Sequence, residues 1–533
     1  MIKNFKIATL AFMFLGASAC TNLDENLVGE ITTDIRIDGV NTGVGSEGGD
    51  ALEAAFAGLR NGFAGHSGIY SLQEVTTDEM VIATKGGDWF DGGILVDLHQ
   101  HTYKANHDFI NGTWGSLYGA VNTCNELLDK TGTGALDAGQ RAQVRVLRAF
   151  YYMKLMDLYG RVKIIVRVGA DAPQSARTVV FDFVEKEILE SLGITTLTSG
   201  LTFATSPLGV SVNPYRINRF GALGILSQLY LNAEVYRGVR MYDRAALAAG
   251  YVIDSGVYRL CGTGCKVTNL GKRNVATDPA ELEGYAAVFA PNNESNPEIV
   301  FSVFFDGVKA GGMNFAHMNL HYSSQFSYNL NDQPWNGYAT LEAFYNSYEA
   351  ADRRRANNFL AGVQLDFGGS AILDYATDDG NPVLNYTPAI NELVPNSRRE
   401  AGARAAKFSF KQFGLSSMDN DYPIVRLGDM HLIRGEALAR NANNWALALP
   451  DVNVIRARAG VSNLPALTDI TFLAERGREM FQEGARRTDL IRFGRYNGTW
   501  WEKPVSTPNK NIFPIPQQQI QVSNGTLTQN PGY

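Results

Sequence analysis

The sequence predicts a mainly α-helical protein: a scaffold of degenerate tetratricopeptide-like helix pairs, interrupted by one loop-rich insertion that carries short strands. Three observations predict this architecture. Apolar residues recur at helical spacing before residue 255 and again after residue 420. Small residues lie where the axes of paired helices would meet, at Ala149, Ala222, Ala233 and Ala246, although no strict repeat of about 34 residues is present. The intervening segment is rich in Gly, Asn, Asp, Tyr and Phe, a composition typical of irregular structure.

The chain starts with the features of a secretory signal. Lys3 and Lys6 precede an apolar run, Ile7–Leu15, that is too short to span a bilayer. Small residues at 16–19 then end directly at Cys20. We expect cleavage after residue 19 and a lipid on Cys20 that anchors the mature protein to a membrane. Ordinary cleavage, which would leave a free cysteine, is the alternative.

Composition excludes several classes of protein. The 533 residues are 45% hydrophobic, enough to bury a large core, and the formal net charge of −7 gives no basic surface for nucleic acid. No later stretch reaches about 18 uninterrupted apolar residues, so we expect no transmembrane helix.

The remaining cysteines are few for a secreted protein. Cys261 and Cys265 flank Gly-Thr-Gly, and this spacing in an oxidising compartment favours a local disulfide over half of a zinc site. Cys124 falls in a helical pattern and is expected to be buried and inert.

Six helices are expected from apolar periodicity and from their end signals. They span Gln140–Gly160, Asn218–Tyr236, Tyr242–Ser255, Pro423–Arg440, Trp445–Ala459 and Asp469–Phe493. Between the third and the fourth, Glu298–Phe305 alternates as a strand does. The aromatic content of this region argues against disorder, and a long ordered loop region is usually functional.

These elements predict the organisation of the chain. A signal peptide (1–19) is followed by one domain (20–533). That domain comprises an N-terminal helical block (20–255), the insertion (256–420) and a C-terminal helical block (421–533).

Motifs in the C-terminal block are the most specific part of the sequence. They are Tyr422-Pro-Ile-Val-Arg-Leu-Gly-Asp429, Glu436-Ala-Leu438, Val454-Ile-Arg-Ala-Arg-Ala-Gly460, Glu475-Arg-Gly-Arg-Glu479, Glu483-Gly484, Asp489-Leu-Ile-Arg-Phe-Gly494 and Asn511-Ile-Phe-Pro-Ile-Pro516. Together they resemble the SusD/RagB family. Arg148-Ala-Phe-Tyr-Tyr152 and the terminal Leu527-Thr-Gln-Asn-Pro-Gly-Tyr533 extend the resemblance over essentially the whole mature chain.

The resemblance implies a helical protein with four degenerate tetratricopeptide units. It also implies a lipoprotein of the outer membrane that faces the cell exterior and is paired with a SusC-like TonB-dependent transporter. Members of this family bind oligosaccharides or, when RagB-like, peptides, and they are not enzymes. We therefore expect no cofactor and no metal site.

Two clusters of polar residues have structural interpretations. Glu475, Glu479 and Glu483 recur every four residues, and we interpret them as part of a structural ion-pair network instead of an acid/base site. Arg426 and Asp429 have the spacing of a pair on a helix.

A histidine cluster offers a possible metal site. His99 and His101 alternate as on a strand face, with His107 beyond. They could ligate a metal, but no carboxylate or cysteine completes a ligand set, so a polar strand face is the better interpretation.

The strongest candidate for ligand binding is a glycine-rich loop, residues 86–93. Asp88 and Asp91 flank Trp89 in this loop, and Lys85 precedes it. A flat aromatic ring stacks on the C–H face of a sugar, while carboxylates accept hydrogen bonds from its hydroxyl groups. The alternative is a tryptophan that only packs its own loop onto the core.

A second loop, residues 333–338, repeats the combination inside the insertion. It contains Trp335, Asn336 and Tyr338. By resemblance, family members place ligand-stacking aromatic residues in both loops, so Trp89 and Trp335 are the leading pair. The other candidates are Tyr338, His321, Asn336, Asp88, Asp91 and Lys85.

The sequence thus predicts a surface lipoprotein that binds a glycan and delivers it to a transporter. A RagB-like peptide binder and a helical-repeat adaptor without a ligand are the alternatives. A glycosidase is disfavoured because no catalytic motif is present.

Overall fold

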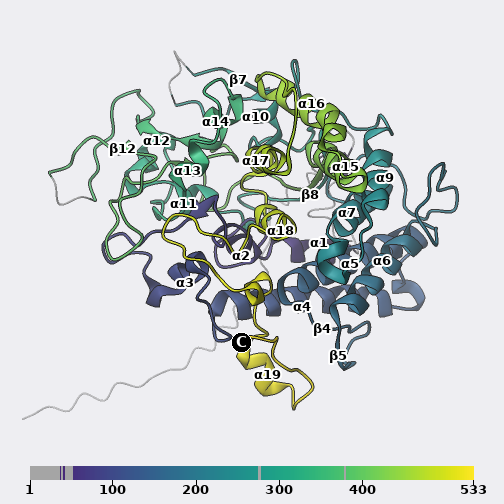
Figure 1. Cartoon of the computed structure of the whole chain (residues 1–533). Helices are drawn as coiled ribbons and strands as arrows, with labels where there is room; N and C mark the ends of the chain where they lie inside the picture. Colours follow the sequence, from purple (N-terminus) through teal and green to yellow (C-terminus); the bar gives the residue numbers. More distant parts are fainter. Residues whose placement is uncertain (1–35, 38–39, 42–51, 274–277, 377–379) are drawn as a thin grey trace, which may run out of the picture.

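The computed structural model describes residues 36–37, 40–41, 52–273, 278–376 and 380–533. The predicted signal peptide and Cys20 lie outside these residues. In Figure 1 the N-terminal helices, blue to teal, form the lower and right-hand parts, and the insertion, green, forms the left. Helices α17 (Asp469–Met480) and α18 (Arg486–Arg492) lie between them. Among the described residues, no helix has the length and apolar character needed to cross a membrane.

The described part of the N-terminal block is built from α-helices. They are α1 (Glu53–Ala57), α2 (Ile69–Glu74), α3 (Ile94–Gln100), α4 (Asp108–Asp129), α5 (Ala138–Tyr159), α6 (Arg177–Ser191), α7 (Arg219–Leu231), α8 (Ala233–Arg237) and α9 (Tyr242–Ile253).

Helix α5 is the central helix of this block. The Asp137 carboxylate accepts a hydrogen bond from the Gln140 backbone N–H (2.7 Å), and the Gln140 side chain accepts one from the Asp137 N–H (3.1 Å). Gly160, with φ 72°, ends the helix. From Ala149 to Tyr159 only Lys154 is not fully buried, because α5 packs between α4 and α6.

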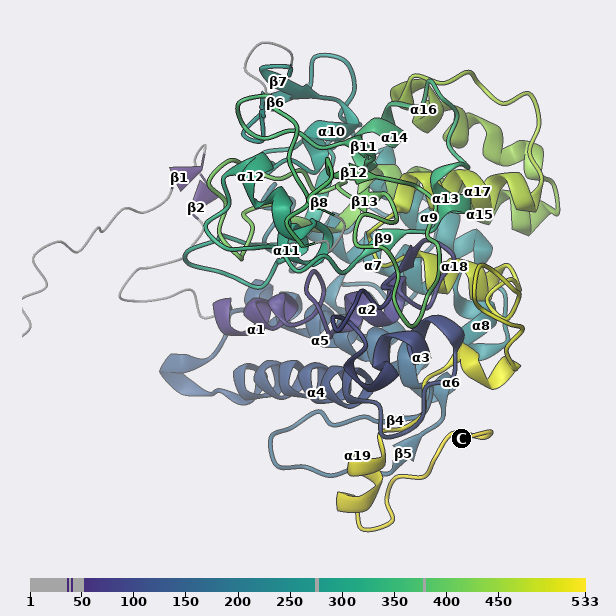
Figure 2. The same ribbon diagram turned by 90° about the vertical axis from the view of Figure 1, so that its left-hand side faces the viewer.

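Helices of the C-terminal block complete the scaffold. They are α15 (Leu427–Ala442), α16 (Leu449–Ala459), α17, α18 and α19 (Gln517–Val522). Helix α15 packs on α9 and α7, so the C-terminal block joins the N-terminal block (Figure 2). Helices α4 and α5, α7 and α9, and α15 and α16 pack as pairs, in line with the expected scaffold of helix pairs, although α4 was not among the six expected helices.

The insertion contains short helices and two-stranded ladders. Its helices are α10 (Tyr285–Val288), α11 (Phe315–Asn319), α12 (Gln325–Tyr328), α13 (Glu342–Tyr345) and α14 (Arg353–Asn358). The antiparallel pairs of the described chain are β1 (Arg36–Ile37) with β2 (Val40–Asn41), β3 (Met80–Val81) with β9 (Ala339–Thr340), β4 (Val162–Lys163) with β5 (Gln174–Ser175), β6 (Lys266–Thr268) with β7 (Glu281–Glu283), β8 (Ile299–Val303) with β14 (Tyr422–Arg426), β10 (Phe359–Leu360) with β13 (Arg404–Ala405), and β11 (Gly362–Val363) with β12 (Asn385–Tyr386). Cys261 and Cys265 form a disulfide at the start of the insertion.

The helix expected over 218–236 is broken in two. Asn232 lies between α7 and α8 and uses both ends of its side-chain amide. Its Nδ2 donates to the Gln228 carbonyl (2.9 Å), and its Oδ1 accepts from Arg492 Nη1 (2.8 Å). A contact with a distant part of the chain therefore sets the end of α7.

The helix expected to start at Pro423 starts four residues later. Residues 422–426 form β14 instead, paired with the fully buried β8. Gly224 allows α7 to approach this strand, because a Cβ atom there would lie 2.3 Å from Val425 Cγ1. The prediction was wrong because the strand partner lies more than a hundred residues away in the sequence.

The helix expected over 469–493 is also two helices. Between α17 and α18 the chain turns through Gln482 (φ 65°) and Gly484 (φ 67°). The Gly484 N–H donates to Glu74 Oε1 (2.6 Å) at the end of α2. The turn therefore docks the C-terminal block on an N-terminal helix.

His99 and His101 do not lie on a strand. His99 is in the last turn of α3, and His101 follows it with φ 58°. His99 Nε2 bonds to the Trp501 carbonyl (2.8 Å), and His101 Nε2 bonds to the Thr76 carbonyl (2.9 Å). Burial lowers the pKa of His99 to about 4 and that of His101 to about 3, so both rings are neutral near pH 7.

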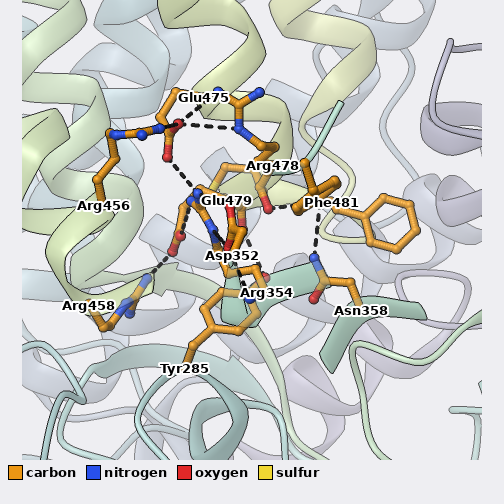
Figure 3. Close-up of polar contacts among 12 residues, drawn as sticks. Tyr285, Asp352, Arg354, Asn358, Arg456, Arg458, Glu475, Arg478, Glu479 and Phe481 are labelled. Atoms are coloured by element: carbon orange, nitrogen blue, oxygen red, sulfur yellow. Dashed lines mark hydrogen bonds and ion pairs between the residues drawn. The ribbon is translucent and has the colours of Figure 1, made fainter. Parts of the chain in front are cut away.

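Buried ion pairs connect α17 to the insertion (Figure 3). Glu475 pairs with Arg354 (2.7 Å), Arg456 (2.8 Å) and Arg478 (2.8 Å). Glu479 pairs with Arg354 (3.1 Å) and also contacts Arg458. These contacts match the structural network that the sequence predicts.

Arg426 also enters this network, not the expected pair with Asp429. Arg426 contacts Glu479 (2.8 Å) and Glu298 (3.0 Å), whereas Asp429 pairs with Arg476 (2.9 Å). The expected pair does not form because Arg426 lies on β14 and Asp429 on α15.

Glu475→Gln should destabilise the protein by about 3–5 kcal/mol at pH 7, because it removes a charged partner from the buried Arg354 and Arg456. Although burial opposes ionisation, Arg354 and Arg478 lower the pKa of Glu475 from 4.5 to about 2. This contribution is present above about pH 4.5 and is lost as the pH falls towards 2. The difference between variant and wild type should therefore shrink by about 2 kcal/mol between pH 7 and pH 3 in urea unfolding.

The exposed pair Lys266–Glu281 supplies the control. Glu281→Gln should change the free energy of unfolding by less than about 1 kcal/mol. A loss in Glu475→Gln as small as this control, or one that does not depend on pH, would contradict the role assigned to the network.

Candidate functional site

Strand pairing brings the two predicted tryptophan loops together. In the β3–β9 pair, Met80 lies opposite Thr340 and Val81 lies opposite Ala339. In an antiparallel pair, the chain that leaves one strand runs beside the chain that enters the other. The loop after β3, which carries Trp89, therefore meets the loop before β9, which carries Trp335.

Trp89 and Trp335 are joined directly. Trp89 Nε1 donates a hydrogen bond to the Trp335 carbonyl oxygen (2.6 Å), across 246 residues of sequence. The Trp89 ring lies on Gly337, where a Cβ atom would be only 2.5 Å from Trp89 Cζ2. Trp89 thus packs its own loop, as the alternative interpretation predicts, yet its half-buried ring also lines an open pocket.

The pocket between the loops has a volume of about 480 Å³, in the range of small-molecule sites. It is lined by His66, Asp88, Trp89, Asp91, Tyr322, Gln333, Pro334 and Trp335. The Trp335 side chain is 37% exposed, so its ring is available to a ligand. Aromatic surface beside carboxylates can stack on the C–H face of a ring and accept hydrogen bonds from hydroxyl groups.

His66 lies among the aromatic rings of the pocket. Its ring centroid is 5.3 Å from that of Trp89 and 6.5 Å from that of Trp335, both edge to face. His66 Nδ1 bonds to the Tyr338 hydroxyl (2.7 Å). Burial lowers the pKa of His66 to about 4, so the ring is neutral at pH 7. Sequence reasoning missed His66; its only local signal is the pair of glycines, Gly65 and Gly68, around it.

Tyr322 was also missed. Its hydroxyl donates to Asp88 Oδ2, which orients that carboxylate at the pocket wall. Burial and the charge of Asp88 raise the pKa of Tyr322, so the phenol stays protonated and remains a donor. No sequence pattern connects the two residues, which lie 234 positions apart.

The structure separates the predicted site residues into two groups. Asp88, Trp89, Asp91 and Trp335 line the pocket. Lys85, His321, Asn336 and Tyr338 are at most 1% exposed and lie behind its wall. A ligand in the pocket cannot contact this second group directly. The sequence predicts ligand contacts for these four residues, but in the structure they support the pocket wall.

Hydrogen bonds show what two of these buried residues support. Lys85 Nζ donates to the Gly337 carbonyl (3.0 Å), and burial lowers its pKa well below the usual value. Asn336 Oδ1 accepts from Arg404 (2.7 Å), and Asn336 Nδ2 donates to the Arg399 carbonyl (3.0 Å). Both residues hold the backbone of the Trp335 loop.

The other two buried residues hold neighbouring segments. His321 Nδ1 accepts the Ser323 N–H (3.1 Å), and its Nε2 lies 3.3 Å from Asp374 Oδ2. The Tyr338 hydroxyl bonds to Ser71 Oγ (2.7 Å) as well as to His66. The polar atoms of both side chains are therefore engaged inside the protein.

Two other hollows differ from this site in size or lining. A cavity among Lys154, Asp157 and Gln228 has a volume of only about 90 Å³, too small for a ligand of several rings. A hollow beside Phe203, Tyr251 and Leu438 is larger, about 690 Å³, but none of the aromatic residues that line it is as exposed as Trp335. Within the described ranges, no group of three or more His, Cys, Asp or Glu residues could hold a metal ion.

Comparison with known proteins identifies the sequences that this chain resembles. A model described as the SusD family matches residues 290–533. The chain is 24% identical over 530 residues to the starch-binding protein SusD of Bacteroides thetaiotaomicron, covering 88% of this chain and 86% of that protein. It is 25% identical over 452 residues to the SusD-like protein P25 of Formosa agariphila, with coverages of 78% and 77%.

Solved structures share the fold. The surface glycan-binding protein A of Bacteroides thetaiotaomicron, in complex with laminarihexaose, superposes with a TM-score of 0.67 at 19% identity, covering 90% of this chain and 98% of that one. A SusD superfamily protein of Parabacteroides distasonis has a TM-score of 0.67 at 18% identity, with coverages of 91% and 98%. These similarities confirm the predicted helical, tetratricopeptide-like fold.

Gly337→Ala should displace the Trp89 ring, because the new methyl group would overlap it. We expect a loss of about 1–3 kcal/mol in the free energy of unfolding by urea, together with a changed near-ultraviolet circular dichroism spectrum. Gly87→Ala, in the Trp89 loop and with nothing within 4 Å of the added Cβ, should leave both unchanged. Equal behaviour of the two variants would show that Trp89 does not rest on Gly337.

Proposed function

We propose that this chain is a SusD-like protein that binds a glycan in the pocket between Trp89 and Trp335. The observation that carries the proposal is the meeting of these two tryptophans with Asp88 and Asp91 in one open pocket. A relative is named for starch binding, and a neighbour in structure for a complex with laminarihexaose, which supports a glycan as the ligand class.

The pocket suits a sugar for physical reasons. The exposed ring of Trp335 offers a flat face, and part of Trp89 extends the same aromatic wall. Asp88, held by Tyr322, and Asp91 offer acceptors for hydroxyl groups. Because the pocket is open, a chain can continue beyond it at either end. An open stacking site of this kind contributes only a few kcal/mol net, so affinity for short oligosaccharides should be modest.

Binding, not catalysis, is the activity. The relatives carry names of binding proteins, and this protein is likewise not an enzyme. We further propose that it is anchored in the outer membrane by a lipid on Cys20 and faces the cell exterior. There it would deliver its glycan to a SusC-like TonB-dependent transporter. The signal sequence and the family resemblance support this arrangement.

Trp335→Ala should weaken glycan binding at least about tenfold, and Trp89→Ala with Trp335→Ala should abolish it in calorimetry on soluble starch and laminarin. Val454→Ala, an exposed apolar residue on α16, is the control and should bind as the wild type does. Wild-type affinity in the double variant would show that the site is elsewhere. Binding of peptides and of no glycan would favour the RagB-like alternative.

Cys20→Ala should release the protein from the membrane fraction of cells that express the full chain, because a lipid chain contributes about 0.8 kcal/mol per buried methylene group. The measurement is immunoblotting of membrane and soluble fractions after cell lysis. Ser18→Ala, two residues earlier, should leave the protein in the membrane fraction. Retention of Cys20→Ala in the membrane fraction would contradict the anchor.

A further inference from the structure

Exposed aromatic rings are rare in this protein and gather in one region. The described chain has six Phe, Tyr and Trp residues that are more than a third exposed: Phe90, Phe326, Trp335, Phe367, Tyr375 and Phe413. Phe90 and Trp335 belong to the two loops of the Trp89–Trp335 pocket. The other four come from three separate segments of the chain and lie together.

Three of these four rings line a second hollow, here called the aromatic cleft. Phe326, Phe367 and Tyr375 line it, with Asn329 and Asp366, around a volume of about 380 Å³. The Phe326 and Tyr375 rings lie 6.1 Å apart, edge to face. Phe413 extends the group, because its ring lies 6.3 Å from that of Phe367.

The cleft is held in shape by hydrogen bonds from its own loops. Asp366 Oδ1 accepts from the N–H groups of Gly368 and Ser370 (2.8 Å each) and closes a tight turn. The Phe367 N–H donates to the Phe326 carbonyl (3.2 Å). Ile372 packs beneath with Leu384 and Tyr386 in a small core. Ordered exposure of large apolar side chains usually marks a binding surface, because burial of the same rings would otherwise stabilise the fold.

The aromatic cleft lies beside the Trp89–Trp335 pocket. Tyr322 lines the pocket and Phe326 lines the cleft, four residues later along one helical segment. Their Cα atoms are therefore roughly 6–8 Å apart along its axis. The Tyr375 N–H donates to Ser323 Oγ (3.3 Å), between the two. Residues 322–326 thus form a wall that both hollows share.

We propose that the aromatic cleft is a second sugar-binding site, which holds a further stretch of the same glycan chain that occupies the Trp89–Trp335 pocket. The inference rests on the proposed function. Rings separated by Asn329 and Asp366 suit a sugar chain, in which C–H faces and hydroxyl groups alternate along the length. The common wall lets one chain reach from pocket to cleft without a long unbound span.

Two linked sites have a measurable consequence. Occupation of the pocket raises the effective concentration of the chain at the cleft, so affinity rises with chain length. A trisaccharide fills one site and gains nothing from the second. A polysaccharide engages both.

The test is a chain-length series measured by calorimetry, with laminaritriose, laminarihexaose and laminarin, and with maltotriose, maltohexaose and soluble starch. Phe326→Ala with Tyr375→Ala should leave trisaccharide affinity unchanged and weaken polysaccharide binding about tenfold or more. Both rings are at least half exposed, so the fold should tolerate their removal, which circular dichroism checks. Val505→Ala with Val522→Ala, exposed apolar residues outside the cleft, is the matched control.

The outcomes separate this inference from the proposed function. If the Phe326/Tyr375 variant binds every chain length as the wild type does, the cleft is not a sugar site, whereas the pocket still stands. Equal weakening at all lengths, trisaccharides included, would also overturn a second site, because the rings would then belong to the pocket. Loss of transporter association without loss of glycan binding would assign the cleft to a protein partner and overturn the inference. Wild-type binding in the Trp89/Trp335 variant would instead contradict the proposed function itself.

Discussion

The buried arginine–glutamate network is the constraint on which the rest of the structure depends. Glu475 and Glu479 carry charges into the core, where an unpaired charge would cost several kcal/mol. Each must therefore meet arginines from other segments, and the arrangement of α17, β14 and the insertion supplies Arg354 and Arg426 at bonding distance. Since hydrophobic burial alone tolerates small displacements and paired charges do not, the network sets the relative positions of these segments.

That positioning extends to the Trp89–Trp335 pocket. Arg486, at the start of α18, bonds to Asp78 (2.7 Å) just before β3. The Glu79 carbonyl then accepts a hydrogen bond from Thr340 Oγ1 on β9 (2.7 Å). The C-terminal helices thus hold the strand pair from which both tryptophan loops emerge. The C-terminal motifs that resemble the SusD/RagB family therefore help to position a pocket formed by loops far away in the sequence.

In the proposed binding surface, buried residues and exposed residues have different roles. Lys85 and Asn336 are buried and hold the backbone of the Trp335 loop, while Trp335 presents its ring to solvent. A loop that exposes apolar surface needs such internal hydrogen bonds, because it would otherwise collapse onto that surface. The aromatic cleft is held in a similar way, because Asp366 accepts a hydrogen bond from the backbone of its own loop. Rigid loops also reduce the entropy lost when a flexible sugar chain binds.

The sequence by itself determined the helical class, the extent of α5 and α9, the glutamates of the ion network and the loops of Trp89 and Trp335, because these depend on periodicity, capping and local composition. Tertiary structure alone decided the rest. Three features each depend on a partner far along the chain. They are strand β14 in place of a helical turn, the breaks at Asn232 and Gly484, and the burial of His321 and Asn336. His66 and Tyr322 entered the pocket for the same reason. Local patterns report which face of an element is apolar, but which distant groups meet there depends on the packing of the whole chain.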